Sequence, residues 1–241
     1  MERVFKTVML GGTGSGKTSL RNHFLFNSHT GQYTPTTNSD FVSTYITRDS
    51  GDMMAVQIWD TSECKPDLLT TQSLLQDADG IMLVYDSSSK ASLHALEKHL
   101  SAVAAVNQAR QSKLPVVLVL TKCDLGANIE QHTECERAKE FCQSRLAIDD
   151  IKCIVTSART GLGVALAFQT IVEMCHSQWH GAMTTSDGPE RLSKARPSRH
   201  GDPITYGEFE LGTSSGAKTR NRGATATRRF RRFLRRLLCF A

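Results

Sequence analysis

The sequence lacks any run of about 18 apolar residues, and no CxxC pair occurs among its seven cysteines. We therefore expect no membrane-spanning helix, and residues 1–10 have no apolar stretch long enough for a secretory signal. The odd number of cysteines and their scattered positions argue against a disulfide framework. These absences together predict reduced thiols in a cytoplasmic protein.

Acidic residues are absent after Glu210, where nine lysines and arginines follow. Since the whole chain has a net charge of +5, residues 1–210 carry the remaining −4. Hydrophobic residues make up 39% of the chain and charged residues 22%, as in a soluble globular protein of one domain plus an appendage. The basic tail indicates an anionic partner, either a membrane or a nucleic acid.

Short apolar segments alternate with helical patterns through the first three-quarters of the chain. Strands are expected at 4–10, 41–48, 53–59, 80–85, 116–120 and 151–156, and helices at 17–26, 92–109, 134–145 and 164–178. This alternation predicts an α/β fold, a six-stranded and mostly parallel sheet with helices on both faces. Ser50-Gly51 is a hairpin signal, so one edge strand is expected to be antiparallel.

The periodic pattern stops near Trp179. Residues 181–227 are rich in Gly, Ser, Thr, Pro and Arg, and they have too few large apolar groups to offset chain entropy. We therefore divide the chain into a domain at 1–180, a disordered linker at 181–227 and a tail at 228–241.

Residues 11–18 read GGTGSGKT and fit the phosphate-loop pattern GxxxxGK[ST] between a strand and a helix. Glycines in such a loop let backbone N–H groups surround phosphate oxygens, and the helix N-terminus adds positive potential. Lys17 would bridge the β- and γ-phosphates, and the Thr18 hydroxyl would ligate Mg²⁺. The alternative is a glycine-rich turn without function, which the flanking elements disfavour.

Residues 121–124, TKCD, follow the expected strand at 116–120. The Asp124 carboxylate can accept hydrogen bonds from guanine N1–H and N2–H₂, whereas adenine would leave that carboxylate unpaired. The Lys122 stem can lie over the base. After the next strand, the segment Ser157-Ala158-Arg159 can place a backbone N–H at the guanine O6. The pattern therefore favours a guanine nucleotide over the adenine of a P-loop ATPase or kinase.

Two more oxygen ligands for Mg²⁺ are expected near the phosphate loop. Thr36 lies in the loop after the first helix, and Asp60 ends the strand at 53–59. Asp60 would hold the ion through a water. The alternatives are ordinary turn chemistry for Thr36 and a helix cap for Asp60.

With these segments in order, residues 5–178 resemble the Ras superfamily of small GTPases, most closely its Rab branch. The five matching motifs are GGTGSGKT, TPTTNSDF, WDTSE, TKCD and TSAR. The resemblance implies a P-loop NTPase G domain that binds GTP or GDP with Mg²⁺. It also implies switch segments at about 29–41 and 60–77, which effector, exchange and activating proteins read in vesicle trafficking or signalling.

The resemblance also assigns site residues. Nucleotide contacts are expected from Gly11, Thr13, Gly14, Ser15, Gly16, Lys17, Thr18, Ser19, His29, Thr36, Thr121, Lys122, Asp124, Ser157, Ala158 and Arg159. Metal ligands are expected at Thr18, Thr36 and Asp60, and catalytic roles at Lys17, Thr36 and Cys64. Thr121 replaces the family's usual asparagine, and His29 stands where an aromatic residue commonly covers the guanine.

The second switch departs from the family, which usually reads DTAGQE where this chain reads Asp60-Thr61-Ser62-Glu63-Cys64-Lys65. Glu63 replaces a glycine whose N–H meets the γ-phosphate, and Cys64 replaces the glutamine that orients the attacking water. A thiol is a poor donor and acceptor, so we predict slow hydrolysis of GTP. A pseudo-GTPase that holds nucleotide without appreciable hydrolysis is the alternative.

Residues 228–240 read RRFRRFLRRLLCF. At 100° per residue all six arginines fall on one half of a helix and the large apolar side chains on the other. This predicts a basic amphipathic helix lying in an anionic membrane surface; nucleic acid, capture by a partner protein and a merely solvated tail are the alternatives. The last three residues, Cys239-Phe240-Ala241, form neither a CaaX motif nor a cysteine pair. Cys239 is a candidate for prenylation or palmitoylation.

Overall fold

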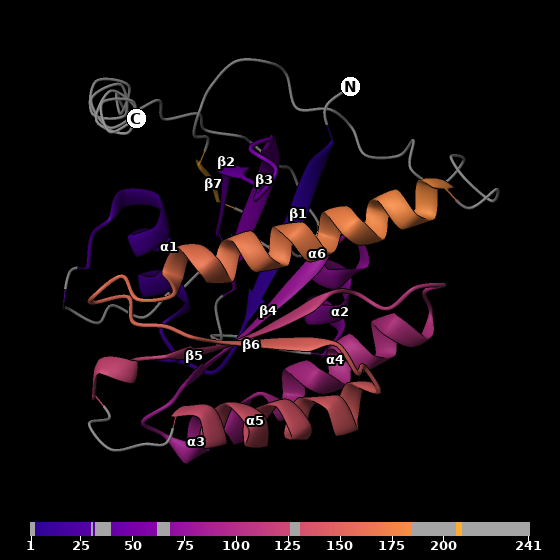
Figure 1. Cartoon of the computed structure of the whole chain (residues 1–241). Coiled ribbons are helices and arrows are strands. Elements are labelled where there is room, and N and C mark those ends of the chain that lie inside the picture. The colour runs from indigo at the N-terminus through magenta and orange to yellow at the C-terminus, as the bar shows by residue number, and fades with distance from the viewer. Residues whose placement is uncertain are drawn as a thin grey trace, which may run out of the picture. The chain divides into compact units, whose positions relative to one another are not determined.

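The computed structural model describes residues 3–29, 31, 40–61, 68–125, 131–184 and 206–208. All of them belong to the first of two compact units, residues 1–210, while the second unit is residues 211–241. Thr36, Cys64, the tail with Cys239 and most of the linker therefore lie outside the described residues. Figure 1 shows the described part as a sheet between helices.

Within the described residues, seven strands form one sheet in the order β6-β5-β4-β1-β3-β2-β7 (Figure 1). The strands are β1 Val4–Leu10, β2 Asp40–Thr47, β3 Met53–Asp60, β4 Gly80–Asp86, β5 Val116–Thr121, β6 Ile151–Val155 and β7 Tyr206–Glu208. The pairs among β1, β3, β4, β5 and β6 are parallel, and β2 pairs antiparallel with β3. The six expected strands and the antiparallel hairpin are confirmed.

The seventh strand was not expected. Tyr206–Glu208 pairs antiparallel with the start of β2, where Tyr206 lies opposite Val42. It falls within 181–227, the segment interpreted as disordered. Its three residues are too few to give a periodic signal, so pairing with β2 is a tertiary effect that the local pattern does not contain.

The helices are α1 Lys17–Phe26, α2 Leu68–Gln76, α3 Lys90–Ala95, α4 Glu97–Gln108, α5 Gln131–Leu146 and α6 Val164–Thr184, with a 3₁₀ turn at Cys123–Leu125. The helix expected at 92–109 is divided at the buried Leu96 into α3 and α4. The sequence reading missed α2, and it ended α6 six residues early. No helix in the described ranges is long and apolar enough to cross a membrane.

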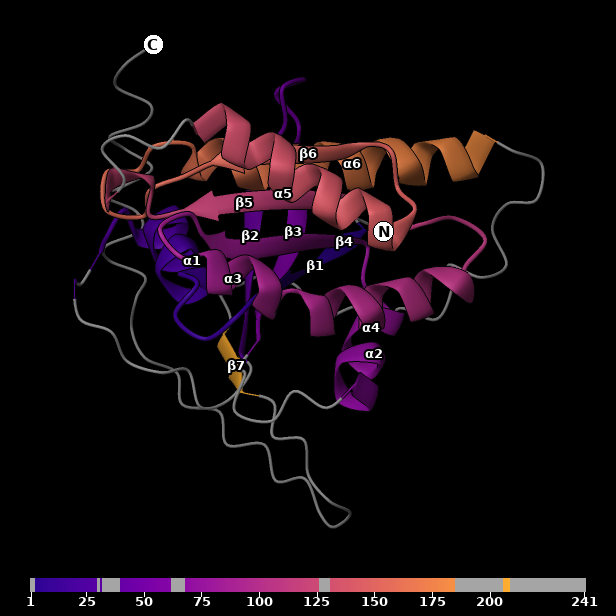
Figure 2. The ribbon, with the colours of Figure 1, turned by 90° about the horizontal axis from the view of Figure 1, so that it is seen from below.

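Two hydrophobic cores cover the two faces of the sheet. Along β4, Ile81 and Leu83 pack with α4 on one face, whereas Met82 and Val84 pack with α6 on the other. All seven residues of β4 are buried, as expected for a continuous apolar run covered on both sides. Figure 2 shows α6 and the pair α2 and α4 on opposite sides of the strands.

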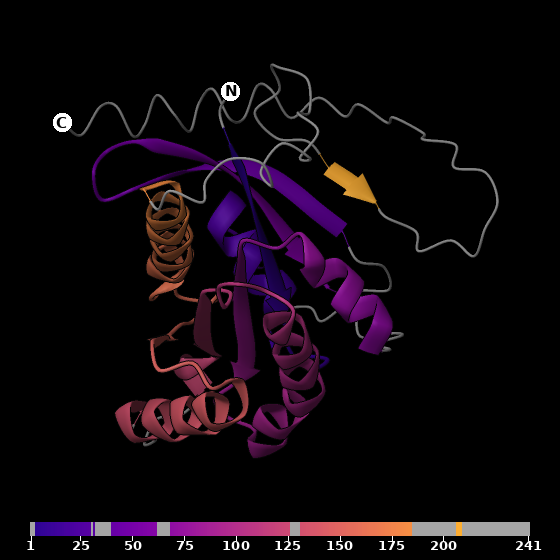
Figure 3. The same ribbon diagram turned by 90° about the vertical axis from the view of Figure 1, so that its right-hand side faces the viewer.

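The β2–β3 hairpin reaches over α6 (Figure 3). Gly51 makes the turn in the left-handed region, with a φ of 88°. At the hairpin end the Arg48 guanidinium donates to the Glu173 carboxylate over 2.9 Å, and the Asp49 N–H donates to the other carboxylate oxygen over 3.0 Å. These bonds fasten the far end of the hairpin to the middle of α6.

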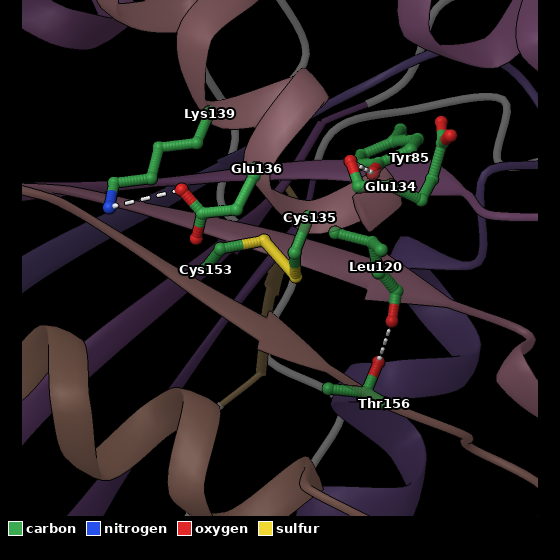
Figure 4. The surroundings of a disulfide bond; sticks show 8 residues. All are labelled: Tyr85, Leu120, Glu134, Cys135, Glu136, Lys139, Cys153 and Thr156. Atoms are coloured by element: carbon green, nitrogen blue, oxygen red, sulfur yellow. Dashed lines mark hydrogen bonds and ion pairs between the residues drawn. A yellow bond between two sulfur atoms is a disulfide. The ribbon is translucent and has the colours of Figure 1, made fainter. Parts of the chain in front are cut away.

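The prediction that all thiols are reduced is wrong for one pair. Cys135 of α5 and Cys153 of β6 form a disulfide, with their Cα atoms 6.0 Å apart (Figure 4). Packing of α5 on β6 brings together two residues that are 18 positions apart, which no spacing rule reveals. The other described cysteines, Cys123, Cys142 and Cys175, are free and buried, and burial raises the pKa of Cys142 to about 12.

Candidate functional site

Most of the predicted site residues that the structure describes lie at one edge of the sheet, where β1, β3, β4, β5 and β6 end. Since parallel strands end at the same edge, the loops after them face one another. Asp60 ends β3, Asp86 ends β4 and Thr121 ends β5, while residues 11–16 connect β1 to α1. Ligands of open α/β sheets bind in the crevice beyond these carboxyl ends.

The phosphate loop is packed tightly at its start and curled around its lysine. A Cβ atom on Gly11 would lie 2.0 Å from the carbonyl oxygen of Val84, so only glycine fits there. Gly16 caps α1 in the left-handed region, with a φ of 97°. The buried Lys17 ammonium donates to the carbonyl oxygens of Gly11 and Gly12 over 2.6 and 3.1 Å. The lysine is therefore held at the mouth of the loop.

Thr18 and Asp60 are adjacent, as expected of two oxygen ligands of one ion. The Thr18 hydroxyl donates to Asp60 Oδ2 over 2.6 Å. Asp60 is fully buried, and its Oδ1 has no hydrogen-bond partner in the described part of the chain. Burial raises the pKa of Asp60, while Arg21 and the Thr18 hydroxyl oppose that rise. A buried carboxylate oxygen left without a donor fits a hard cation such as Mg²⁺.

Thr121 ties the base-recognition segment to the phosphate loop. Its hydroxyl donates to the carbonyl oxygen of Ser15, and it also lies 3.1 Å from the carbonyl oxygen of Tyr85. Thr121 is 1% exposed, and the Gly16 backbone passes close to its side chain. The threonine in place of the family's usual asparagine thus still bridges the two loops.

Lys122 and Asp86 form the next contact along this edge. The Lys122 ammonium donates to Asp86 Oδ2 over 2.8 Å, and Ser88 donates to Asp86 Oδ1. Burial raises the pKa of Asp86, but the bonds from Lys122 and Ser88 outweigh it and hold the pKa below its ordinary value. Lys122 has a φ of 59°, a region that few residues with a side chain adopt and that concentrates at functional sites.

Asp124 is held by the segment that follows β6. Ser157 Oγ donates to Asp124 Oδ1 over 2.7 Å, and Arg159 Nη1 lies 3.7 Å from Asp124 Oδ2. The Ser157 hydroxyl also accepts the N–H of Thr160, which closes the turn. The structure thus brings Asp124 and the segment Ser157-Ala158-Arg159 together, the two parts expected to recognise guanine.

The other predicted residues that the structure describes differ in their exposure. Ser15 is buried and its Oγ has no hydrogen-bond partner among the described residues. Thr13 and His29 are exposed, and Gly14 and Ser19 are half-buried. Thr36 and Cys64 lie outside the described residues.

Two residues of the site, Arg21 and Asp86, were not predicted from the sequence. Arg21 reaches Asp40 and Asp60 from α1, and Asp86 at the end of β4 pairs with Lys122. Asp86 follows an apolar run at the end of β4, and this position at the carboxyl end of a buried strand could have predicted it as a site residue. Arg21 follows Thr18 by three positions and so shares its helix face, but its partners come from distant strands.

A doubly wound sheet with a phosphate loop at the carboxyl ends of its strands defines the P-loop NTPase class. The family model of the Ras family matches residues 6–177, and the chain belongs to this family. Ras-related protein Rab7 of Drosophila melanogaster is 27% identical over 202 residues, which cover 83% of this chain and 94% of the relative.

Two fungal relatives are similar at the same level. The Ypt/Rab-type GTPase avaA of Emericella nidulans is 28% identical over 176 residues, 73% of this chain and 83% of the relative. The Ypt/Rab-type GTPase YPT7 of Saccharomyces cerevisiae is 26% identical over 178 residues, 73% of this chain and 84% of the relative. These names agree with the predicted Rab branch.

Proposed function

We propose that the protein is a guanine-nucleotide-binding switch that holds GTP or GDP with Mg²⁺. The observation that carries this proposal is the hydrogen bond from the Thr121 hydroxyl to Ser15 of the phosphate loop, since Thr121 begins the segment that contains Asp124. Lys17 would contact the phosphates, and Thr18 and Asp60 would hold the ion, which supplies positive charge beside them. The Rab-type GTPase names of the relatives support the same function.

Asp124 sets the choice of base in this proposal. Its carboxylate would accept from guanine N1–H and N2–H₂, so a base without the 2-amino group should bind less tightly. In the full chain we expect GDP to bind more tightly than IDP by about 10-fold, and we expect Asp124→Asn to reduce this preference. Competition against a fluorescent GDP measures both. Equal displacement by ADP and GDP would contradict guanine recognition.

We further propose that intrinsic hydrolysis is slow because Cys64 cannot orient water as an amide does. Losing that orientation should slow the reaction by about 100-fold. Single-turnover hydrolysis by the wild-type chain and by the double variant Glu63→Gly, Cys64→Gln tests this. We expect the double variant to be faster. No turnover by either chain, with GTP bound, would favour the pseudo-GTPase alternative.

The place of action in this proposal is the cytoplasmic face of an anionic membrane, in trafficking or signalling. The arginine and apolar halves of residues 228–240 would lie in the headgroup region, with Cys239 as a lipidation site. Effector, exchange and activating proteins would read the two switch segments. Sedimentation of the full chain with anionic and with neutral vesicles checks the tail: binding to neutral vesicles alone would contradict it.

A further inference from the structure

One arginine contacts both Asp60, the carboxylate proposed to hold Mg²⁺, and Asp40 at the start of β2. Arg21 lies in α1, one turn after Thr18, and its side chain is 8% exposed. Its Nη1 contacts Asp40 Oδ1 and lies 3.4 Å from Asp60 Oδ2. Asp40 and Asp60 are directly opposite each other across the β2–β3 pair. Arg21 is thus a buried cation between two facing carboxylates.

The cluster would be unstable without a cation. Two carboxylates facing each other across a strand pair repel, and one of these is fully buried. The Thr18 hydroxyl supplies one hydrogen bond to Asp60 but no charge. Arg21 therefore supplies positive charge at the same carboxylate that Mg²⁺ would use.

From this geometry we infer that Arg21 is a resident cation that takes over part of the electrostatic role of Mg²⁺ in retaining nucleotide. This inference rests on the proposed function. If Mg²⁺ were removed, an Asp60 carboxylate without a compensating charge would repel the phosphates and speed release of the nucleotide. In this chain Arg21 remains beside Asp60, so the affinities for Mg²⁺ and for nucleotide are less strongly coupled than they would be in the same site without this arginine.

The direct measurement is the dissociation rate of fluorescent GDP from the full chain, in excess Mg²⁺ and after addition of EDTA. The dissociation rate after EDTA divided by the rate in excess Mg²⁺ reports how strongly Mg²⁺ and nucleotide binding are coupled. We expect Arg21→Met, which keeps most of the side-chain volume but not the charge, to raise this ratio by about 10-fold. Arg21→Lys should stay near wild type. Arg137→Met is the matched control, since Arg137 pairs with Glu134 on the exposed side of α5.

A second variant separates the charge effect from loss of packing. Asp40→Asn removes one anion that competes for Arg21, so the guanidinium pairs with Asp60 alone. The ratio of the GDP dissociation rates should therefore fall or stay constant. A merely structural role would move both variants in the same direction. If Arg21→Met changes the ratio by less than 2-fold, or if Asp40→Asn raises it as Arg21→Met does, the inference is overturned.

The failure of the inference can be told apart from failure of the proposed function. A folded chain that binds no fluorescent GDP would contradict both. A chain that binds GDP, with the same ratio in wild type and in Arg21→Met, would contradict the role of Arg21 alone. Should Arg21→Met not fold, Arg21→Lys and Asp40→Asn still decide: neither variant should raise the ratio, and an equal rise in both would overturn the inference.

Discussion

The side-chain hydroxyl of Thr121 donates a hydrogen bond to the carbonyl oxygen of Ser15, which joins the end of β5 to the phosphate loop. The two residues are 106 positions apart in the chain. Both are almost fully buried, so neither carbonyl nor hydroxyl has water as a ready substitute partner. The bond couples the part of the site expected to hold the base to the part expected to hold the phosphates.

Removing this hydroxyl should loosen both halves of the site. Thr121→Val keeps the shape but leaves the Ser15 and Tyr85 carbonyl oxygens without their partner, which costs about 1–3 kcal/mol of unfolding free energy. Urea unfolding followed by fluorescence measures this loss, and nucleotide release should accelerate in parallel. Thr121→Ser retains the hydroxyl and should lose less than half as much; equal losses would point to packing of the methyl group instead.

Two glycines of the phosphate loop should respond differently to the same change. Gly11→Ala would put a Cβ atom 2.0 Å from a backbone oxygen of β4, and neither backbone can move away cheaply. We expect Gly11→Ala to lower the free energy of unfolding by about 3 kcal/mol or more. Gly14→Ala is the control, because no atom of the described residues lies within 4 Å of its Cβ position and its φ of 74° is what opposes the change.

The cost of Gly14→Ala should therefore be about 1 kcal/mol. Thermal unfolding of the three chains ranks them. If both variants were equally destabilised, close approach to Val84 would not be what makes Gly11 necessary.

The disulfide between Cys135 and Cys153 should be detectable chemically. Alkylation of the unfolded chain without reductant should modify two cysteines fewer than alkylation after reduction, which mass spectrometry shows. Closing an 18-residue separation stabilises the fold by about 3 kcal/mol in the chain-entropy account, so reductant should lower the unfolding midpoint. Cys135→Ala is the control, since reductant should leave its midpoint unchanged. Full alkylation without reductant would contradict the bond.

The contact between the β2–β3 hairpin and α6 should depend on pH in a defined direction. Burial raises the pKa of Glu173, but hydrogen bonds from Arg48 and the Asp49 N–H outweigh it and hold the pKa below its ordinary value of 4.5. Because the folded-state pKa is lowered, this contribution to stability is fully present above pH 4.5 and is lost as the pH falls through the folded-state value.

Arg48→Gln should therefore cost about 1 kcal/mol at pH 7 and progressively less below pH 4.5. Urea unfolding at a series of pH values measures the difference from wild type. Arg137→Gln, at an exposed pair within α5, should cost little at any pH. A cost for Arg48→Gln that is constant down to pH 3 would mean that the ionised Glu173 is not its source.

The fold was predictable where the local pattern carries the signal. The apolar run of β4 and the glycine turn between β2 and β3 determined strand positions to within one residue. The helix at 92–109 was expected in one piece because its apolar spacing continues through Leu96, and only the packed structure shows the break. The short β7 has no period at all.

The site was predictable where a motif fixes the residues and unpredictable where contacts cross the chain. Lys17, Thr18, Asp60 and Asp124 stand in recognisable strings, and they lie at one edge of the sheet. Arg21, by contrast, meets partners 19 and 39 residues later, in strands whose register no local pattern gives. The same holds for Cys135 and Cys153, whose pairing depends on how α5 lies on β6.

The short strand β7 has a practical consequence for how the protein is handled. β7 pairs with Asp40–Val42 only, so among the described residues the remainder of β2 has a strand partner on one side alone. An open strand edge is a template for pairing with another molecule. A shortened chain that ends before Tyr206 would extend this open edge along the whole of β2. Preparations of such a chain should therefore self-associate at lower concentrations than the 241-residue chain.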